Sequence, residues 1–275
     1  MGNIDKEVVE DFGKEWSEYD QSDLSSHQVK EAFNQYFTIF PFDKIDDQSV
    51  GFDMGCGSGR WADLVAPRVG TLNCIDPSDK ALSVAKDKLQ RYDNINFLCS
   101  SVDEVNIPLN SQDFGYSLGV LHHVPDTEAG IRSCSKLLKQ GAPFLLYLYY
   151  NLDNKPSWFR FIWKLSDVFR LFISSLPFGL KKPVCNLISL IVYLPLARLA
   201  FIFEKIGLPH KNIPLSDYRN KNFYFMKTDA LDRFGTKLEQ RFSRLDIEKM
   251  LINCGFENIQ FSEGTPYWVS IAYKK

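Results

Sequence analysis

The chain has 275 residues, of which 45% are hydrophobic and 24% charged, and its formal net charge is −2. These are ordinary globular values, and the length suits one large domain or one domain with an insertion. No basic excess is available to neutralise phosphates, so we expect no nucleic-acid partner. The six scattered cysteines form no CxxC pair and neighbour no histidine at ligand spacing. This pattern argues against a metal site and predicts buried free thiols in a reducing cytoplasm.

Two helical patterns open the chain, at about 5–20 and 26–39. The charged N-terminal residues lack the apolar core of a signal peptide, which agrees with a cytoplasmic protein. After residue 41, strand and helix patterns alternate, and this alternation predicts parallel βαβ units with right-handed crossovers. Strands are expected at 49–54, 72–75, 95–99, 114–118 and 144–150, and helices at 60–67, 78–90 (capped by Ser78) and 126–140 (closed by Gly141).

The alternation stops after the fifth strand. Residues from about 152 to 225 show helical patterns rich in Trp, Phe, Leu and Ile and punctuated by prolines. The longest uncharged stretch, 183–197, is interrupted by Pro195 and is too short for a membrane span. A helix at 243–254 follows, and then two strands at about 256–262 and 267–273, whose short link makes them an antiparallel pair.

Three glycines follow the first strand at alternate positions, Gly55, Gly57 and Gly59, and a helix begins directly after them. Positions without side chains let the backbone approach a ligand, and a helix N-terminus favours an anionic group. Asp76 ends the next strand, where a carboxylate can accept hydrogen bonds from both hydroxyls of a ribose. The glycines, the flanking elements and the acid together predict a site for a nucleoside ligand.

The segment from Asp53 to Gly59 resembles motif I of the class I S-adenosylmethionine-dependent methyltransferases, which runs hydrophobic-hydrophobic-Asp-x-Gly-x-Gly-x-Gly. Ile75-Asp76-Pro77-Ser78 is similar to the second motif of that family, and the stretch 113–126 to the segment around its fourth strand. The resemblance covers about 40–150 and 240–275. It implies a Rossmann-like α/β fold with a mostly parallel seven-stranded sheet, an antiparallel C-terminal hairpin, N-terminal helices and a helical insertion after the fifth strand.

The resemblance implies S-adenosylmethionine as cofactor and no metal. Asp53 and the glycines would meet its methionyl end, and Asp76 its ribose. Ser101 stands where many relatives carry an acid for the adenine amino group, with the Val102 backbone or Asp103 as alternatives. The cofactor-binding residues implied in this way are Trp16, Asp53, Gly55, Cys56, Gly57, Gly59, Asp76, Pro77, Ser101, Val102 and Leu118.

His122 and His123 follow the fourth strand, at the sheet edge where open α/β sheets bind ligands. Either could take a proton from the acceptor or orient it, and either could instead cap the next helix. We favour His123 as the residue that faces the pocket. Candidates for acceptor binding are the end of the fifth strand and the polar segment after the insertion, whose arginines could clamp an anionic group or pair with neighbouring acids: Tyr149, Tyr150, Asn151, Tyr218, Arg219, Arg233 and Arg241.

The predicted organisation is a helical cover at 1–42, a cofactor-binding domain at 43–151 and 240–275, and a helical insertion at 152–239 that shapes the acceptor pocket. A lid and an apolar core are favoured for the insertion over a membrane device, although basic residues beside the apolar ones leave an interfacial helix open. The expected function is methyl transfer to an oxygen or nitrogen of a small organic acceptor by in-line displacement. The alternatives are an inactive cofactor-binding partner protein, or a nicotinamide oxidoreductase, which Arg60 disfavours because it replaces the third glycine of G-x-G-x-x-G.

Overall fold

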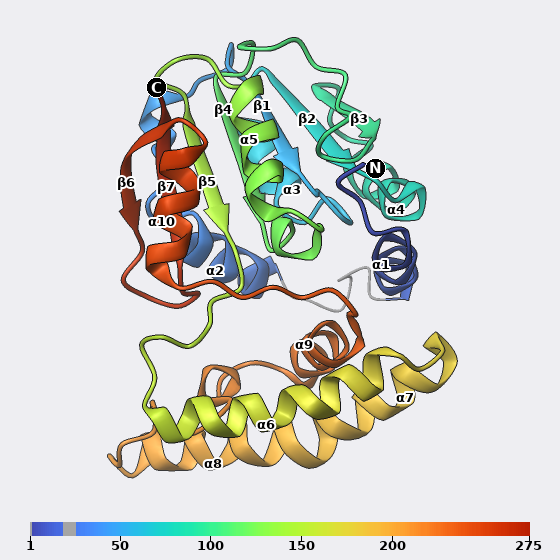
Figure 1. Ribbon diagram of the computed structural model, residues 1–275, viewed down its shortest axis with the longest axis vertical. Helices are drawn as coiled ribbons and strands as arrows, with labels where there is room; N and C mark the ends of the chain where they lie inside the picture. The colour runs from blue at the N-terminus through green and yellow to red at the C-terminus, as the bar shows by residue number, and fades with distance from the viewer. Residues whose placement is uncertain (1, 19–25) are drawn as a thin grey trace. The chain divides into compact units, whose positions relative to one another are not determined.

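The computed structural model describes residues 2–18 and 26–275. Their contacts divide the chain into two compact units: a sheet unit, Met1–Asn151 with Leu238–Lys275, and a helical unit, Leu152–Lys237. The sheet unit thus contains both chain ends, and the helical unit is a single insertion between Asn151 and Leu238 (Figure 1).

The sheet unit is built on one seven-stranded sheet with the order β3-β2-β1-β4-β5-β7-β6 (Figure 1). Neighbours among β1 to β5 are parallel, whereas β7 runs antiparallel to β5 and to β6. The predicted fold class is confirmed. The strands are β1 (Val50–Met54), β2 (Thr71–Asp76), β3 (Ile95–Cys99), β4 (Phe114–Leu118), β5 (Pro143–Tyr147), β6 (Phe256–Phe261) and β7 (Val269–Lys274).

Alternating side chains of the strands build a core on each face of the sheet. Leu72 and Tyr116 belong to one core cluster, with Phe33 of α2 and Phe37 directly after that helix. Phe52 and residues of α5 and α10 belong to the other. The helices of this unit are α1 (Lys6–Glu18), α2 (Ser26–Tyr36), α3 (Ala62–Val65), α4 (Asp79–Leu89), α5 (Thr127–Leu137) and α10 (Arg244–Asn253), with 3₁₀ turns at η1 (Phe42–Lys44), η2 (Ala66–Arg68) and η3 (Leu121–His123).

Ser78 caps α4 as predicted, because its hydroxyl accepts the amide of Ala81. Helix α5 is shorter than predicted: it ends at Leu137, and Gly141 lies in the turn before β5. The reason is that Lys139 donates its amide to the carbonyl of Gln112, so the chain after α5 pairs with the segment before β4.

Two further expectations need correction at the sheet edges. Strand β5 ends at Tyr147 and not at 150, because its neighbour β7 begins at Val269, opposite Tyr147. All six cysteines are free, but Cys99 is exposed, since it ends the edge strand β3.

The helical unit consists of α6 (Ser157–Ser174), α7 (Phe178–Ile188), the π-helical segment η4 (Ser189–Tyr193), α8 (Leu194–Lys205), η5 (Ser216–Tyr218) and α9 (Phe223–Gly235). From Phe178 to Lys205 the chain forms one continuous helix of 28 residues, which by length and composition alone could cross a membrane. The expectation that this stretch is too short is therefore wrong. Pro195 does not end the helix, because it lies in the first turn of α8, where a missing amide is tolerated, directly after the π-helical segment.

Candidate functional site

The glycine loop lies between β1 and α3. Gly55, Gly57 and Gly59 all have positive φ angles, of 80°, 53° and 75°. A Cβ atom on Gly55 would lie 2.3 Å from Val120, and one on Gly57 would lie 3.1 Å from the indole of Trp16. The loop therefore needs glycine both for its backbone conformation and for its close neighbours. Cys56 beside them is buried, and its amide donates to the carbonyl of Ile75 over 3.0 Å.

Asp76 is the last residue of β2 and faces this loop. Its two carboxylate oxygens accept the amides of Gly57 and Ser78, each over 2.9 Å, so the acid holds the glycine loop and the start of α4 together. Burial raises the pKa of Asp76 to about 6, against the opposing effect of those two amides. At neutral pH the group is a carboxylate whose remaining lone pairs can accept further donors.

Asp53 on β1 is almost fully buried, and one of its oxygens, Oδ2, has no hydrogen-bond partner in the structure. Burial raises the pKa of Asp53 to about 8; the neighbouring Tyr116 hydroxyl opposes this rise and the charge of Asp76 adds to it. An acid held in this way is stabilised by any cationic or hydrogen-donating group that reaches it.

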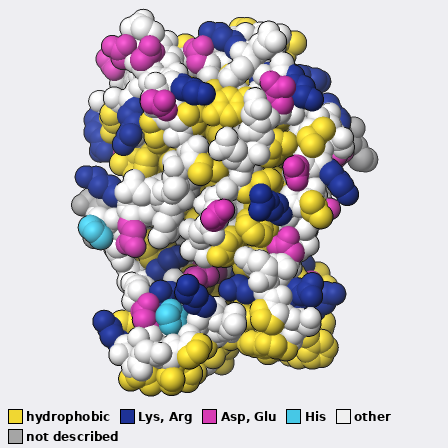
Figure 2. All heavy atoms as spheres, turned by 90° about the vertical axis from the view of Figure 1, so that its left-hand side faces the viewer, with side chains coloured by type: hydrophobic (Ala, Val, Ile, Leu, Met, Phe, Trp, Pro, Cys, Tyr) yellow, Lys and Arg dark blue, Asp and Glu magenta, His cyan; other side chains and the backbone are white. Residues whose placement is uncertain are grey.

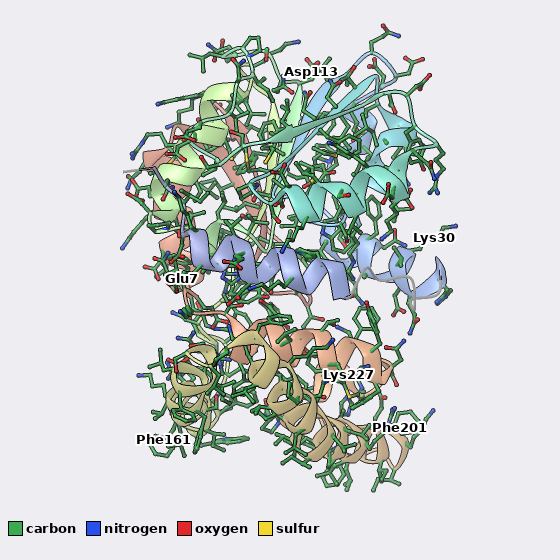
Figure 3. The ribbon with its side chains drawn as sticks, turned by 90° about the vertical axis from the view of Figure 1, so that its right-hand side faces the viewer. Glu7, Lys30, Asp113, Phe161, Phe201 and Lys227 are labelled. Atoms are coloured by element: carbon green, nitrogen blue, oxygen red, sulfur yellow. The ribbon has the colours of Figure 1, made fainter. Side chains whose placement is uncertain are left out.

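The N-terminal segment covers this end of the sheet unit. The indole of Trp16 lies over Gly57, and Phe12 contacts His123 with ring centroids 4.9 Å apart. Phe12 and Trp16 belong to helix α1, which carries the label Glu7 in Figure 3. Asn3 ties the segment down further on: its backbone amide donates to Asp103 over 2.7 Å, and its side chain exchanges hydrogen bonds with the backbone of Asp126.

The loop after β3 carries the residues predicted for the adenine end. Ser101 and Val102 are buried, and the Ser101 hydroxyl has no hydrogen-bond partner in the structure. Pro77 precedes α4 and is partly buried, and Leu118 ends β4 with 9% of its surface exposed. All of these residues belong to loops or strand ends at the carboxyl edge of the parallel strands, where such sheets bind their ligands.

His122 and His123 lie in the turn η3 after β4. The ring of His122 is fully buried, stacks on Tyr149 at 3.8 Å between centroids, and has no hydrogen bond at either nitrogen. Burial, with smaller contributions from His123 and Arg241, holds its pKa well below the ordinary value, so the ring is neutral at pH 7. In His123, Nδ1 lies 2.7 Å from the carbonyl of Leu238, and since a carbonyl only accepts, this nitrogen is the donor.

The residues predicted to bind the acceptor are divided between the two units. In the sheet unit, the guanidinium of Arg241 lies 5.0 Å from the Tyr149 ring centroid and donates to Glu239 and to the Tyr150 carbonyl. Asn151 donates its amide to the Phe242 carbonyl, and its side-chain oxygen has no partner in the structure.

In the helical unit, Tyr218 packs against Tyr193, and both arginines make ion pairs. Arg219 pairs with Glu204 over 2.9 Å, and Arg233 pairs with Asp167 over 3.2 Å. The three predicted side chains, Tyr218, Arg219 and Arg233, have these partners within their own unit, and their role toward an acceptor stays a prediction.

Three residues of the site were not singled out as site residues from the sequence: Asn3, Tyr116 and Val120. Asn3 lies 100 positions from Asp103, and no local pattern reveals such a contact. Tyr116 could have been found, because alternation along β4 places it in the same layer as Asp53, to which it is paired in register. Among the described residues no group of three or more His, Cys, Asp or Glu side chains could hold a metal ion.

Asp53→Asn is expected to make the ligand-free protein more stable than wild type at alkaline pH. The folded-state pKa of Asp53, about 8, lies above its ordinary value of 3.8, so the folded state binds a proton that the unfolded state lacks between these values. Stability therefore falls as pH rises through this window, and an uncharged amide removes the loss. Thermal unfolding of Asp53→Asn from about pH 5 to about pH 9 should show a Tm several degrees above wild type at the alkaline end.

The matched control for this experiment is Asp87→Asn, which changes an exposed carboxylate on α4. Its melting curve should follow that of wild type at every pH. If Asp53→Asn loses stability with rising pH as wild type does, then ionisation of the buried Asp53 carboxyl does not cause the loss.

Comparison with known proteins agrees with this geometry. Residues 52–146 match the family model described as "Methyltransferase domain". The chain is 29% identical over 104 residues to the ubiquinone biosynthesis O-methyltransferase of Coxiella burnetii, covering 38% of this chain and 43% of that protein. It is 35% identical over 105 residues to the enzyme of the same name from Nitrosospira multiformis, covering 38% and 42%. The matched region thus spans less than half the length of these relatives.

A solved structure shares the fold over nearly the whole chain. A methyltransferase from Thermotoga maritima, described as dependent on S-adenosylmethionine, superposes with a TM-score of 0.51 at 13% identity, covering 96% of this chain and all of that one. At this identity the likeness concerns the fold. Residues 52–146 therefore match the methyltransferase domain family, and they lie within a fold that the chain shares with that methyltransferase.

Proposed function

We propose that this protein transfers a methyl group from S-adenosylmethionine to an oxygen or nitrogen of a small organic acceptor. The observation that carries the proposal is the glycine loop with its left-handed backbone, fixed to the partly buried Asp76 through the amide of Gly57. The acid and the loop come from neighbouring strands and meet at the carboxyl edge of the sheet.

The residues at this edge fit the cofactor. Oδ2 of Asp53 is a buried acceptor without a partner, suited to the cationic amino group of the methionyl part. Asp76 would hold the ribose hydroxyls, and Ser101, whose buried hydroxyl also has no partner, would meet the adenine with the Val102 backbone. Trp16 and Leu118 would complete the apolar lining, with Cys56 and Pro77 beside the loop.

When bound, S-adenosylmethionine supplies a methyl group on a sulfonium, so that the acceptor attacks the methyl carbon in line and the C–S bond breaks with its electron pair going to sulfur. The chain's own contribution is alignment of the acceptor and exclusion of water, and positioning of this kind can lower a barrier by roughly 7–11 kcal/mol. An oxygen or nitrogen nucleophile that carries a proton must also lose it, and His122 or His123 would receive that proton.

His123 is the better candidate for this base. The Leu238 carbonyl fixes its proton on Nδ1, and in that tautomer Nε2 is the basic nitrogen. His122 is packed flat against Tyr149 and would act by orienting its neighbour. The acceptor would also meet Tyr149, Tyr150 and Asn151, and an anionic acceptor would gain from the nearby charge of Arg241. That Tyr218, Arg219, Arg233 and the segment 152–239 shape the acceptor pocket stays a prediction.

Isothermal titration tests the cofactor assignment. We expect binding of S-adenosylmethionine and of S-adenosylhomocysteine, and no heat from NAD. Incubation with labelled S-adenosylmethionine and pooled metabolites should then release S-adenosylhomocysteine and a labelled product. Binding without a product would favour a partner protein that has lost catalysis, and NAD binding without response to the sulfur nucleosides would end the methyltransferase proposal.

A further inference from the structure

Helix α6 turns an apolar stripe toward solvent. Its buried residues, Arg170, Ile173 and Ser174, face the interior of the helical unit. The exposed side chains recur at spacings of three and four residues, so they form one continuous stripe along the helix. These residues, which we call the α6 stripe, are Trp158, Phe161, Ile162, Leu165, Val168, Phe169 and Phe172, each between 49% and 69% exposed.

The continuous helix α7–η4–α8 is apolar on two opposite sides. One side carries the buried residues Cys185, Ser189, Tyr193 and Ala197, four positions apart, and its elements pack against α9. The other side remains exposed, so only 22% of the most apolar window of this helix is buried. Its exposed large hydrophobic residues are Leu180, Leu187, Leu190, Ile191, Val192, Leu199 and Ile202.

The sequence favours a lid with an apolar core for the insertion. The side chains of the α6 stripe and of the exposed side of α7–η4–α8 are in contact with solvent, which argues against a role for them in a core. A soluble surface rarely carries an apolar area of this extent without a partner. Figure 2 shows hydrophobic side chains gathered over the helical part of the molecule, with Lys and Arg side chains bordering them.

The helical unit is also strongly basic. Residues 152–237 contain 14 Lys and Arg against 6 Asp and Glu, a net charge of +8, whereas the rest of the chain has 18 against 28, a net charge of −10. Arg160 and Lys164 are exposed and flank the α6 stripe, one helical turn apart. An apolar face bordered by basic residues is the pattern of a helix that lies in a membrane interface and meets anionic headgroups.

We propose that the helical unit docks on the surface of a lipid bilayer that contains anionic lipids, with the α6 stripe and the exposed side of α7–η4–α8 in the headgroup region. The basic charge decides between this occupant and a second copy of the chain, because two helical units that each carry a net charge of +8 repel each other. The α7 and η4 parts of the 28-residue helix pack against α9, so protein covers one side of that part of the helix. Peripheral docking agrees with the cytoplasmic location expected from the sequence.

Vesicle co-sedimentation of the full chain tests the proposal without reference to cofactor or activity. Wild type should pellet with phosphatidylcholine vesicles that contain phosphatidylglycerol, and less with phosphatidylcholine alone. The double variant Phe161→Ser/Phe172→Ser removes two phenyl rings of the stripe, each 69% exposed, and should lower partitioning at least about tenfold. Replacing Arg160 and Lys164 by Gln should lower binding to the anionic vesicles by about fivefold per residue.

The matched control is Leu109→Ser/Leu245→Ser, which removes two leucines of the sheet unit that are 65% and 64% exposed. This variant should sediment as wild type does, and circular dichroism would verify that both double variants fold. Wild type that stays in the supernatant with both kinds of vesicle would overturn the proposal. So would a stable dimer that dissociates in Phe161→Ser/Phe172→Ser and binds no vesicles, because the stripe would then be an interface between copies.

Discussion

Asp76→Ala is expected to weaken S-adenosylmethionine binding by about tenfold or more. Two ribose hydrogen bonds to a charged acceptor would be lost, and such bonds contribute on the order of 1.5–3 kcal/mol each. The same substitution removes the acceptor of the Gly57 and Ser78 amides, so the glycine loop loses its support as well. Isothermal titration measures the affinity, and circular dichroism verifies that the sheet unit remains folded.

Asp79→Ala serves as the control, since it removes an exposed carboxylate three residues further on, in the first turn of α4. Its affinity should stay within about twofold of wild type. An affinity that Asp76→Ala leaves unchanged would remove Asp76 from the site and would leave the match of residues 52–146 to the methyltransferase domain intact.

Gly55→Ala is expected to destabilise the sheet unit by about 2–5 kcal/mol and to reduce cofactor affinity with it. The added methyl group would lie 2.3 Å from Val120, and the φ angle of 80° is one that alanine adopts only at a cost. Left-handed backbone costs about 1–2 kcal/mol for a residue with a Cβ, and overpacking adds about 1–3 kcal/mol. Thermal unfolding and titration with the cofactor measure the two effects.

Two further variants separate these causes. Gly141→Ala has a similar φ angle, 77°, but no atom within 4 Å of the new Cβ, so it should show the backbone cost alone. Val120→Ala in the Gly55→Ala background removes the two closest colliding atoms, Cγ1 and Cγ2, and leaves Cβ at 2.8 Å, so it should restore part of the lost stability. If Gly141→Ala costs as much as Gly55→Ala, the contact with Val120 does not account for the requirement at position 55.

The cofactor side of the molecule was predictable because its signals are local. The strand before Gly55, the acid at the end of β2 and the Ser78 cap lie in one short segment from β1 to the start of α4, and each follows from short-range backbone chemistry. Register between parallel strands then brings Asp53 and Tyr116 into one layer, which a period of two can foresee.

The structure of the insertion was harder to predict from the sequence. A helical period in the apolar residues shows that a helix has an apolar side and a polar side, but it does not show which side is buried by the rest of the protein. The α6 stripe shows the same spacing as a core-facing stripe, and only the structure shows that Arg170 is the buried side chain there. Likewise, charge alone did not reveal that Arg233 pairs with Asp167, since those residues are 66 positions apart. Contacts of this length depend on how the helices pack, and no local rule determines them.

The first residues of the chain have a consequence for the rate at which a nucleoside ligand could bind and dissociate. Asn3 is bonded to the loops after β3 and β4, and the indole of Trp16 lies over Gly57, so a ligand at the glycine loop would be enclosed from the side of α1. Exchange of spent cofactor for fresh would require these hydrogen bonds to break, each with a net strength of about 0.5–1.5 kcal/mol. The turnover rate would then be limited by how often this segment lifts, and the methyl transfer itself could be faster than the overall cycle.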